Sequence, residues 1–181
     1  YTELSVTKRF WLNSYGRIDL YGRAGAQWNK VPFPLLITPA ANNSYIIQRN
    51  MFNMINNMEF MNDRFISMEI QWDLSGKLFN RIPLLKHLKW REVIGFKTLY
   101  GKLTDKNNPQ KQPLDSRLFE FPSREGVFTS FVMGDTPYME LNVGIHNIFK
   151  ILRVDYVRRL NYLNIPDTKK NGVRFVLQFD F

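Results

Sequence analysis

The stretch GVRFVLQFDF, residues 172–181, decides the fold of this chain. From Val173 to Phe181 every odd position is apolar, whereas most of the even positions are polar. This alternation is typical of a β-strand with one apolar and one polar face. Chain ends fray unless something holds them, so a soluble domain seldom leaves three phenylalanines on one face of a terminal strand. The stretch therefore favours a strand that faces a lipid bilayer, with a core strand of a soluble β-protein as the alternative.

Composition limits the classes of protein that fit. The chain has 181 residues, a formal charge of +9 and no cysteine, which allows one domain and excludes a disulfide frame or a thiolate metal site. No window of eighteen apolar residues occurs, which excludes a transmembrane helix. The aromatic residues follow alternating strand faces and are not interleaved with a basic stripe, so we expect no nucleic-acid partner. The basic residues fit the interior and the rims of a barrel better.

Alternation predicts an all-β fold, an antiparallel up-and-down transmembrane β-barrel. The expected strands cover residues 3–11, 17–28, 58–72, 91–102, 138–146, 151–161 and 173–181. They number seven, or eight if a turn at Asp63 makes a hairpin of residues 51–72, which we favour because Asp63 and Arg64 would be costly in mid-bilayer. Barrels of this kind use even strand numbers, so residues 1–181 are expected to be the C-terminal part of a larger barrel domain.

The connections differ in character. Residues 29–50 and 103–137 are expected to be long loops, the second with local pairing between 118–121 and 127–132. Residues 74–90 predict a short basic amphipathic helix after Pro83. That helix would lie at a membrane interface, or would plug the end of a soluble barrel.

The late strands separate two sets of side chains. One set is expected to face lipid: Met139, Leu141, Val143, Ile145, Leu152, Val154, Tyr156, Phe175 and Leu177. The other set is expected to form a charge network in the lumen: Glu140, Arg153, Asp155 and Arg159. Periodicity cannot say which face is inside, so the inverse arrangement in a soluble barrel stays open.

The terminal strand resembles the closing strand of bacterial outer-membrane barrels, whose last residues are read by the assembly machinery. Arg174, Phe179 and Phe181 match the polar and aromatic places of that signal, and Val176 stands where glycine is usual. Further segments resemble a family of Bacteroidota outer-membrane proteins that join a carboxypeptidase-regulatory-like domain to a C-terminal barrel. These segments are VPFPLL (31–36), the pairs Glu59-Phe60 and Asp63-Arg64, LFNRIPLLKHLKWREV (78–93) and PYMELNVGIHNIFKILRVDYVRRL (137–160).

The stretch from Pro137 to Leu160 is also similar, more distantly, to late strands of the surface-antigen barrels that insert or translocate proteins at the outer membrane. That superfamily carries an Arg-Gly-aromatic motif on a loop folded into the barrel. No such triplet occurs in this chain, so the resemblance carries over no insertase mechanism.

Residues suited to catalysis are few. His87 belongs to the basic segment without a carboxylate at helical spacing, and His146 ends a strand on its polar face, where a structural role is favoured. There is no nucleophile elbow and no phosphate-binding glycine loop, so we expect neither an enzyme nor a cofactor. The sequence predicts a bacterial outer-membrane protein for envelope assembly, protein or solute transport, or a structural platform. Its expected partners are outer-membrane lipid, upstream strands or partner barrel chains, and other envelope proteins. The alternative is a soluble all-β module that binds an anionic ligand.

Overall fold

The computed structural model describes residues 1–48, 50–113 and 120–177. The strands in these ranges are β1 (Thr2–Trp11), β2 (Arg17–Ala26), β3 (Arg64–Asp73), β4 (Arg91–Lys102), β5 (Ser123–Arg124), β6 (Val127–Phe128), β7 (Tyr138–Ile148), β8 (Leu152–Arg159) and β9 (Asn171–Leu177). One helix, α1 (Pro83–Lys86), and four 3-10 turns complete the set (Asn13–Tyr15, Phe33–Leu35, Phe79–Arg81 and Pro109–Lys111). Phe179 and Phe181, predicted parts of the assembly signal, lie outside the described residues.

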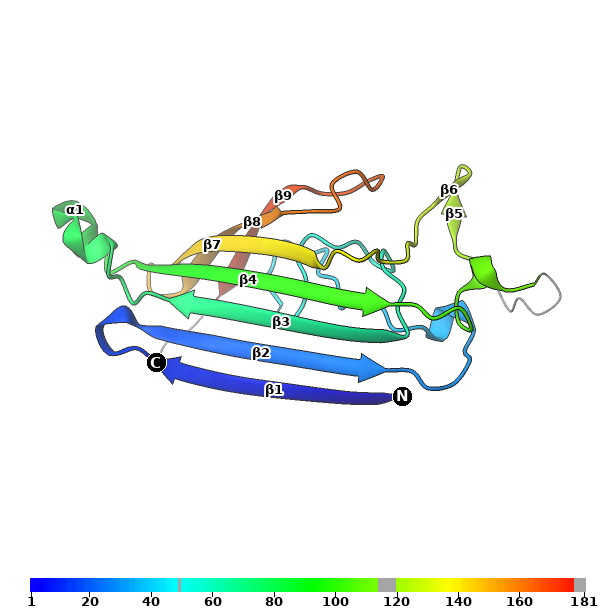
Figure 1. The fold of residues 1–181 in the computed structure, drawn as a ribbon. Helices are drawn as coiled ribbons and strands as arrows, with labels where there is room; N and C mark the ends of the chain where they lie inside the picture. Colours follow the sequence, from blue (N-terminus) through cyan, green and yellow to red (C-terminus); the bar gives the residue numbers. More distant parts are fainter. Residues whose placement is uncertain (49, 114–119, 178–181) are drawn as a thin grey trace.

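Seven strands form one antiparallel sheet in the order β1-β2-β3-β4-β7-β8-β9. Each strand pairs with the next in sequence, apart from the small β5–β6 hairpin, which is separate. The sheet curls, so that β8 and β9 lie behind β7 and β4 in Figure 1. Across the described residues β1 and β9 do not pair, and the sheet stays open. The predicted all-β fold with seven strands is confirmed, and these residues alone form no closed barrel.

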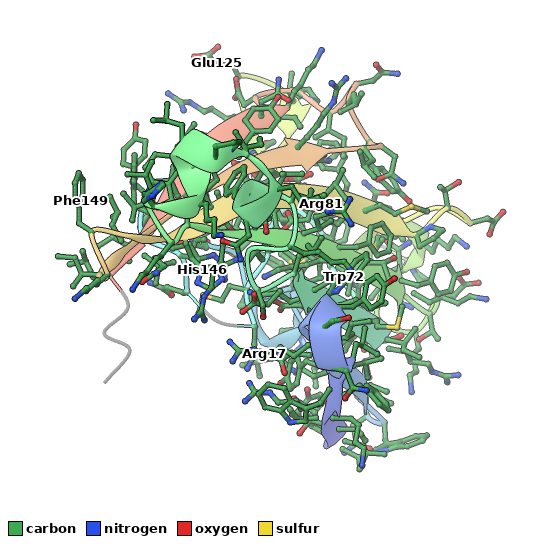
Figure 2. All side chains as sticks on the ribbon, turned by 90° about the vertical axis from the view of Figure 1, so that its left-hand side faces the viewer. Arg17, Trp72, Arg81, Glu125, His146 and Phe149 are labelled. Carbon is green, nitrogen blue, oxygen red and sulfur yellow. The ribbon has the colours of Figure 1, made fainter. Side chains whose placement is uncertain are left out.

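The register gives the two faces of the sheet opposite chemistry. One row of neighbours that crosses all seven strands on the convex face is wholly apolar: Phe10, Ile18, Trp72, Ile94, Val143, Tyr156 and Val173. A row on the concave face is mostly charged: Thr7, Tyr21, Glu69, Lys97, Glu140 and Arg159. Figure 2, drawn from one end of the strands, shows Arg17 and His146 within the curve of the sheet and Trp72 outside it.

Residues 51–63, which we call the inner segment, correct one prediction. We expected a strand from residue 58, or a hairpin over 51–72, but β3 begins only at Arg64. Met54, Ile55, Phe60 and Met61 are instead fully buried. They pack in an irregular segment whose backbone joins other loops through single bridges at Phe52, Phe60 and Asn62. The alternation of apolar residues predicted a strand here, but the same spacing also occurs in an irregular segment that is buried on several sides.

Two small apolar clusters surround the inner segment. One holds Phe52, Ile55, Phe60, Leu99, Met133 and Tyr138, and the other holds Leu36, Met61, Leu103 and Phe121. Both combine the inner segment with the long loops and with concave-face residues near the end of β4. The apolar core therefore lies between the sheet and its longest connection, and not between two sheets.

The two longest connections lie at the same end of the sheet. Residues 27–63, 103–137 and 160–170 join strands at one end, which we call the loop end. Residues 12–16, 74–90 and 149–151 lie at the other, the turn end, where β9 also finishes (Figure 1). The predicted helix of 74–90 has only four residues: Pro83 is its first residue, and after Lys86 the chain continues in i→i−3 bonds up to Lys89, which has a positive φ of 53°. The predicted local pairing of 118–121 with 127–132 is also replaced: Leu118 lies outside the described residues, and β6 pairs with Ser123 and Arg124.

Candidate functional site: a polar interior

The centre of the concave face binds the backbone of the inner segment. Glu140 on β7 accepts hydrogen bonds from the backbone amides of Asn53 at 3.0 Å and Met54 at 3.1 Å. It also accepts one from the Tyr138 hydroxyl at 3.0 Å. A carboxylate that receives several N–H and O–H donors is well satisfied although it is buried. Glu140 therefore serves as an anchor for the inner segment.

Arg159 on β8 is the second anchor. Its side chain is wholly buried and forms an ion pair of 2.7 Å with Glu59 of the inner segment. It also donates to the carbonyl oxygens of Met54 at 3.1 Å and Tyr162 at 2.9 Å. Its guanidinium lies 5.0 Å from the ring centre of Tyr138. These contacts satisfy a buried charge that would otherwise be costly.

Two further cations complete the attachment. Arg174 on β9 donates to the Asn53 carbonyl oxygen at 2.6 Å. Lys97 on β4 donates to the Met51 carbonyl oxygen at 2.6 Å and pairs with Glu69 at 3.2 Å. Side chains from β4, β7, β8 and β9 thus hold one irregular segment by its backbone.

A second polar group lies toward the turn end. Asp155 pairs with Arg153 at 2.6 Å and accepts a hydrogen bond from the Asn142 amide at 2.9 Å. Asp73 lies 3.3 Å from His146 and 3.5 Å from Arg17. Both carboxylates are at least nine-tenths buried. Charge on this face is therefore balanced from β2 to β8.

The predicted charge network lies on one face but is divided. Arg153 and Asp155 pair with each other, as neighbours on one strand face can. Glu140 and Arg159 stand opposite each other in the β7–β8 register, yet each binds the inner segment. Sequence reasoning missed Glu59 and Lys97 as members of this interior. The sequence offered one signal for each. Glu59 is a single carboxylate in the apolar run around Phe60, and Lys97 is a single lysine between Gly95 and Gly101.

The residues predicted to face lipid all lie on the convex face or at its turn-end edge. Val143 is 50% exposed and Leu177 is 66% exposed, whereas the alternate position Asn142 is 8% exposed. Phe175, 42% exposed, also bonds through its backbone to Tyr45 and Ile47 at 2.7 Å. His146 is buried. His87 is exposed in the connection 74–90, with a ring nitrogen 2.9 Å from the Pro83 carbonyl oxygen.

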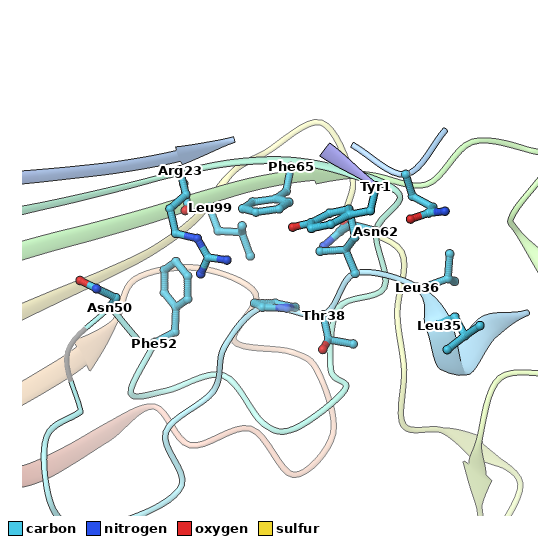
Figure 3. Close-up of a pocket in the computed structure, with 14 residues that line it drawn as sticks. Tyr1, Arg23, Leu35, Leu36, Thr38, Asn50, Phe52, Asn62, Phe65 and Leu99 are labelled. Atoms are coloured by element: carbon cyan, nitrogen blue, oxygen red, sulfur yellow. The ribbon is translucent and has the colours of Figure 1, made fainter. Parts of the chain in front are cut away.

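A cavity of about 410 Å³ lies between the inner segment and the concave faces of β2 and β3 (Figure 3). Its wall is mixed: Arg23, Phe65, Leu99 and Tyr1 lie along the sheet side, and Phe52 of the inner segment lies across from them. Arg23 is already paired with Glu3 at 2.6 Å.

Near the loop end, burial raises the pKa of the Tyr162 phenol above its ordinary value. Within the described ranges no group of three or more His, Asp or Glu side chains could hold a metal ion.

Fold and site define an all-β protein with a curled antiparallel sheet, an apolar convex face and a polar concave face filled by its own loop. A model of the family described as a family of unknown function, DUF5686, C-terminal domain, matches residues 1–109. The match covers more than half of the chain, and the chain belongs to this family. No curated protein and no solved structure is similar enough to the chain to count as a match. No helix in the described part of the chain is long and apolar enough to cross a membrane.

Proposed function

We propose that this chain forms the C-terminal seven strands of an outer-membrane β-barrel whose interior is plugged by its own inner segment. The protein is non-enzymatic and acts in envelope assembly, in transport, or as a structural platform. The observation that carries the proposal is the inversion of the two faces. Most charged side chains on the concave face of β4, β7, β8 and β9 are buried, and the exposed side chains of the convex face are mostly apolar, with Lys8 and Arg158 among the charged exceptions.

Val143 shows the inversion at one position, because it is half exposed while its neighbours Asn142 and Gly144 are buried. Exposed apolar patches of more than a few hundred Å² are rare on soluble monomers. An apolar row across seven strands therefore needs a covering, and acyl chains supply one without a specific partner. The charged face, by contrast, suits the lumen of a barrel, where polar side chains are the rule.

The two ends of the sheet also fit a barrel that crosses the outer membrane. Barrels of this class have short periplasmic turns and long external loops. The two longest connections here, 27–63 and 103–137, both lie at the loop end, and the longest at the turn end is 74–90, which contains α1. Exposed aromatic residues stand near both ends, as expected of interface girdles. Trp11 (70% exposed) and Phe149 (86%) lie at the turn end, and Trp28 (61%) lies at the loop end. The turn end would then face the periplasm.

The filled concave face favours some roles over others. Four strands bind the inner segment through buried charges, so passive solute flow past it would require breaking several charge-assisted hydrogen bonds. The arrangement suits a platform or an assembly protein better than an open pore. The resemblance to Bacteroidota outer-membrane proteins belongs to this proposal.

Extraction of the full-length protein tests the proposal. We expect it to stay with the membrane fraction through alkaline and high-salt washes and to be released only by detergent. Release by plain buffer, together with binding to an anionic resin ligand, would support the soluble module and overturn the membrane assignment.

A further inference from the structure

Residues 77–90, which we call the basic segment, have a composition unlike the rest of the chain. The sequence KLFNRIPLLKHLKW contains Lys77, Arg81, Lys86 and Lys89 but no acidic residue. The cations alternate with leucine and isoleucine over one 3-10 turn and α1. The segment therefore joins four positive charges to apolar side chains in a small volume.

The basic segment is held in shape by its own contacts. The Asn80 amide donates to the Gly76 carbonyl oxygen at 2.8 Å, and the Lys86 amide donates to that of Ile82 at 3.0 Å. The Glu92 carboxylate accepts from the Phe79 amide, and the Phe79 and Trp90 rings lie 6.4 Å apart. The base of the segment is thereby fixed to β4. The fold therefore determines which side chains of the segment are exposed.

The apolar side chains of the segment point away from the protein. Leu84 is 80% exposed, and Leu78, Ile82 and Leu88 are each about half exposed. Figure 1 shows α1 beyond the ends of β3 and β4, at the turn end. The neighbouring β7–β8 turn adds Phe149, also exposed at this end in Figure 2. Arg81, Lys86 and Lys89 are exposed in the same segment, whereas Lys77 is half-buried over the Tyr15 ring. An apolar tip with three exposed cations is thus available for contact.

We propose that the basic segment binds the surface of a bilayer that contains anionic phospholipid, on the periplasmic side. This rests on the proposed function, which sets the turn end against the inner leaflet. Leucine side chains enter the boundary of headgroups and acyl chains, and the cations meet lipid phosphates. An acidic protein partner is less favoured, because the exposed leucines stand on a protruding tip and not in a groove.

A fluorescent reporter at the tip tests this proposal. Residues 1–181 contain no cysteine, so Leu84→Cys in the full-length protein, with any cysteine outside these residues changed to serine, gives a defined thiol for an environment-sensitive dye. We expect blue-shifted emission and several-fold weaker quenching by acrylamide in vesicles of phosphatidylcholine with phosphatidylglycerol than in phosphatidylcholine alone. High salt should reverse part of the difference, because exposed charges are screened. Glu125→Cys, in the β5–β6 turn at the loop end, is the control and should show no lipid dependence.

A charge variant tests whether the cations bind anionic lipid or whether the tip only lies close to the bilayer. Changing the exposed Arg81, Lys86 and Lys89 to glutamine should abolish the effect of phosphatidylglycerol on the dye at position 84. The same change at Lys102, Lys106 and Lys111, toward the loop end, should leave that effect intact.

The outcomes distinguish this proposal from the proposed function. A protein that resists alkaline extraction while the dye stays fully accessible in both vesicles overturns lipid binding and leaves the barrel standing. Crosslinking of the accessible tip to a periplasmic protein would overturn it in the same way. A protein that is not inserted, but whose dye still responds to phosphatidylglycerol, supports lipid binding and overturns the barrel.

Discussion

Val143 and Asn142 are neighbours on β7 whose side chains occupy opposite environments. From the sequence alone, arginine at Val143 would be costly whether the site faced lipid or a soluble core. The structure changes this, because Val143 is 50% exposed on the convex face. If that face met water, Val143→Arg would shift the free energy of unfolding by no more than about 0.5 kcal/mol. In lipid we expect a loss of roughly 2–4 kcal/mol, if the site is near the midplane.

Denaturant titration of the full-length protein folded into lipid vesicles measures this loss. Val143→Ala is the control, because acyl chains can fill the space of the removed methyl groups, and it should change the free energy of unfolding less than a core cavity would. A neutral Val143→Arg in vesicles would contradict the membrane assignment.

The pair of Arg159 and Glu59 tests the attachment of the inner segment. Removing one partner leaves an uncompensated buried charge, so Arg159→Met should cost about 3–5 kcal/mol of stability. Adding Glu59→Leu should recover part of this loss, because no unpaired carboxylate then remains. Arg158→Met, on the exposed side of the same strand, is the matched control. Equal losses at Arg158 and Arg159 in a denaturant titration would count against the anchor.

At the scale of elements, much of the sheet could be predicted because alternation reports a strand with two unlike faces. β1, β4 and β7 lie within about two residues of their expected bounds. The inner segment could not be predicted in this way, since its apolar residues are buried by long-range contacts that no local period records. The same limit applies to the site: Glu140 and Arg159 were placed on the right face, but their partners come from a loop far away in the sequence.

Glycines on the concave face show how the strands and the polar interior fit together. A Cβ added at Gly95 would lie 2.0 Å from Asn142 Oδ1, whereas a Cβ added at Gly22, on the convex face, would lie 4.0 Å from the Ser67 carbonyl oxygen, its nearest contact outside the adjacent residues. Gly95→Ala must therefore displace Asn142 from its hydrogen bond with Asp155, and we expect a loss of about 1–3 kcal/mol. Gly22→Ala should be neutral within about 0.5 kcal/mol. Thermal unfolding of both variants tests this, and a tolerated Gly95→Ala would show that the strands can repack.

At the scale of the molecule, the connections at the two ends of the sheet predict which end faces the cell exterior. The connection 103–137 carries the exposed Lys106 and Lys111 at the loop end, while Lys150 is exposed at the turn end. Trypsin added to intact cells should cut near Lys106 or Lys111 and should not reach Lys150. Permeabilised cells are the control, in which Lys150 becomes a site. Protection of residues 103–137 in intact cells, read by mass spectrometry of the fragments, would contradict the orientation.

Whether the sheet closes into a barrel is a property of the whole molecule that can be tested at its two edges. Among the described residues no strand pairs with the outer edge of the ten-residue β1, while the edge of β9 is occupied at Phe175 by the backbone of Tyr45 and Ile47. We expect upstream strands to complete the barrel, because unpaired strand edges are not stable in lipid. A strand that joins β9 there must displace Ile46 from Phe175. Oxidation of an Ile46→Cys, Phe175→Cys variant should therefore form a disulfide in residues 1–181 expressed alone, but not in the full-length protein in membranes. Efficient crosslinking in the full-length protein would show that β9 is not joined to an upstream strand at Phe175, and the larger closed barrel would then be wrong.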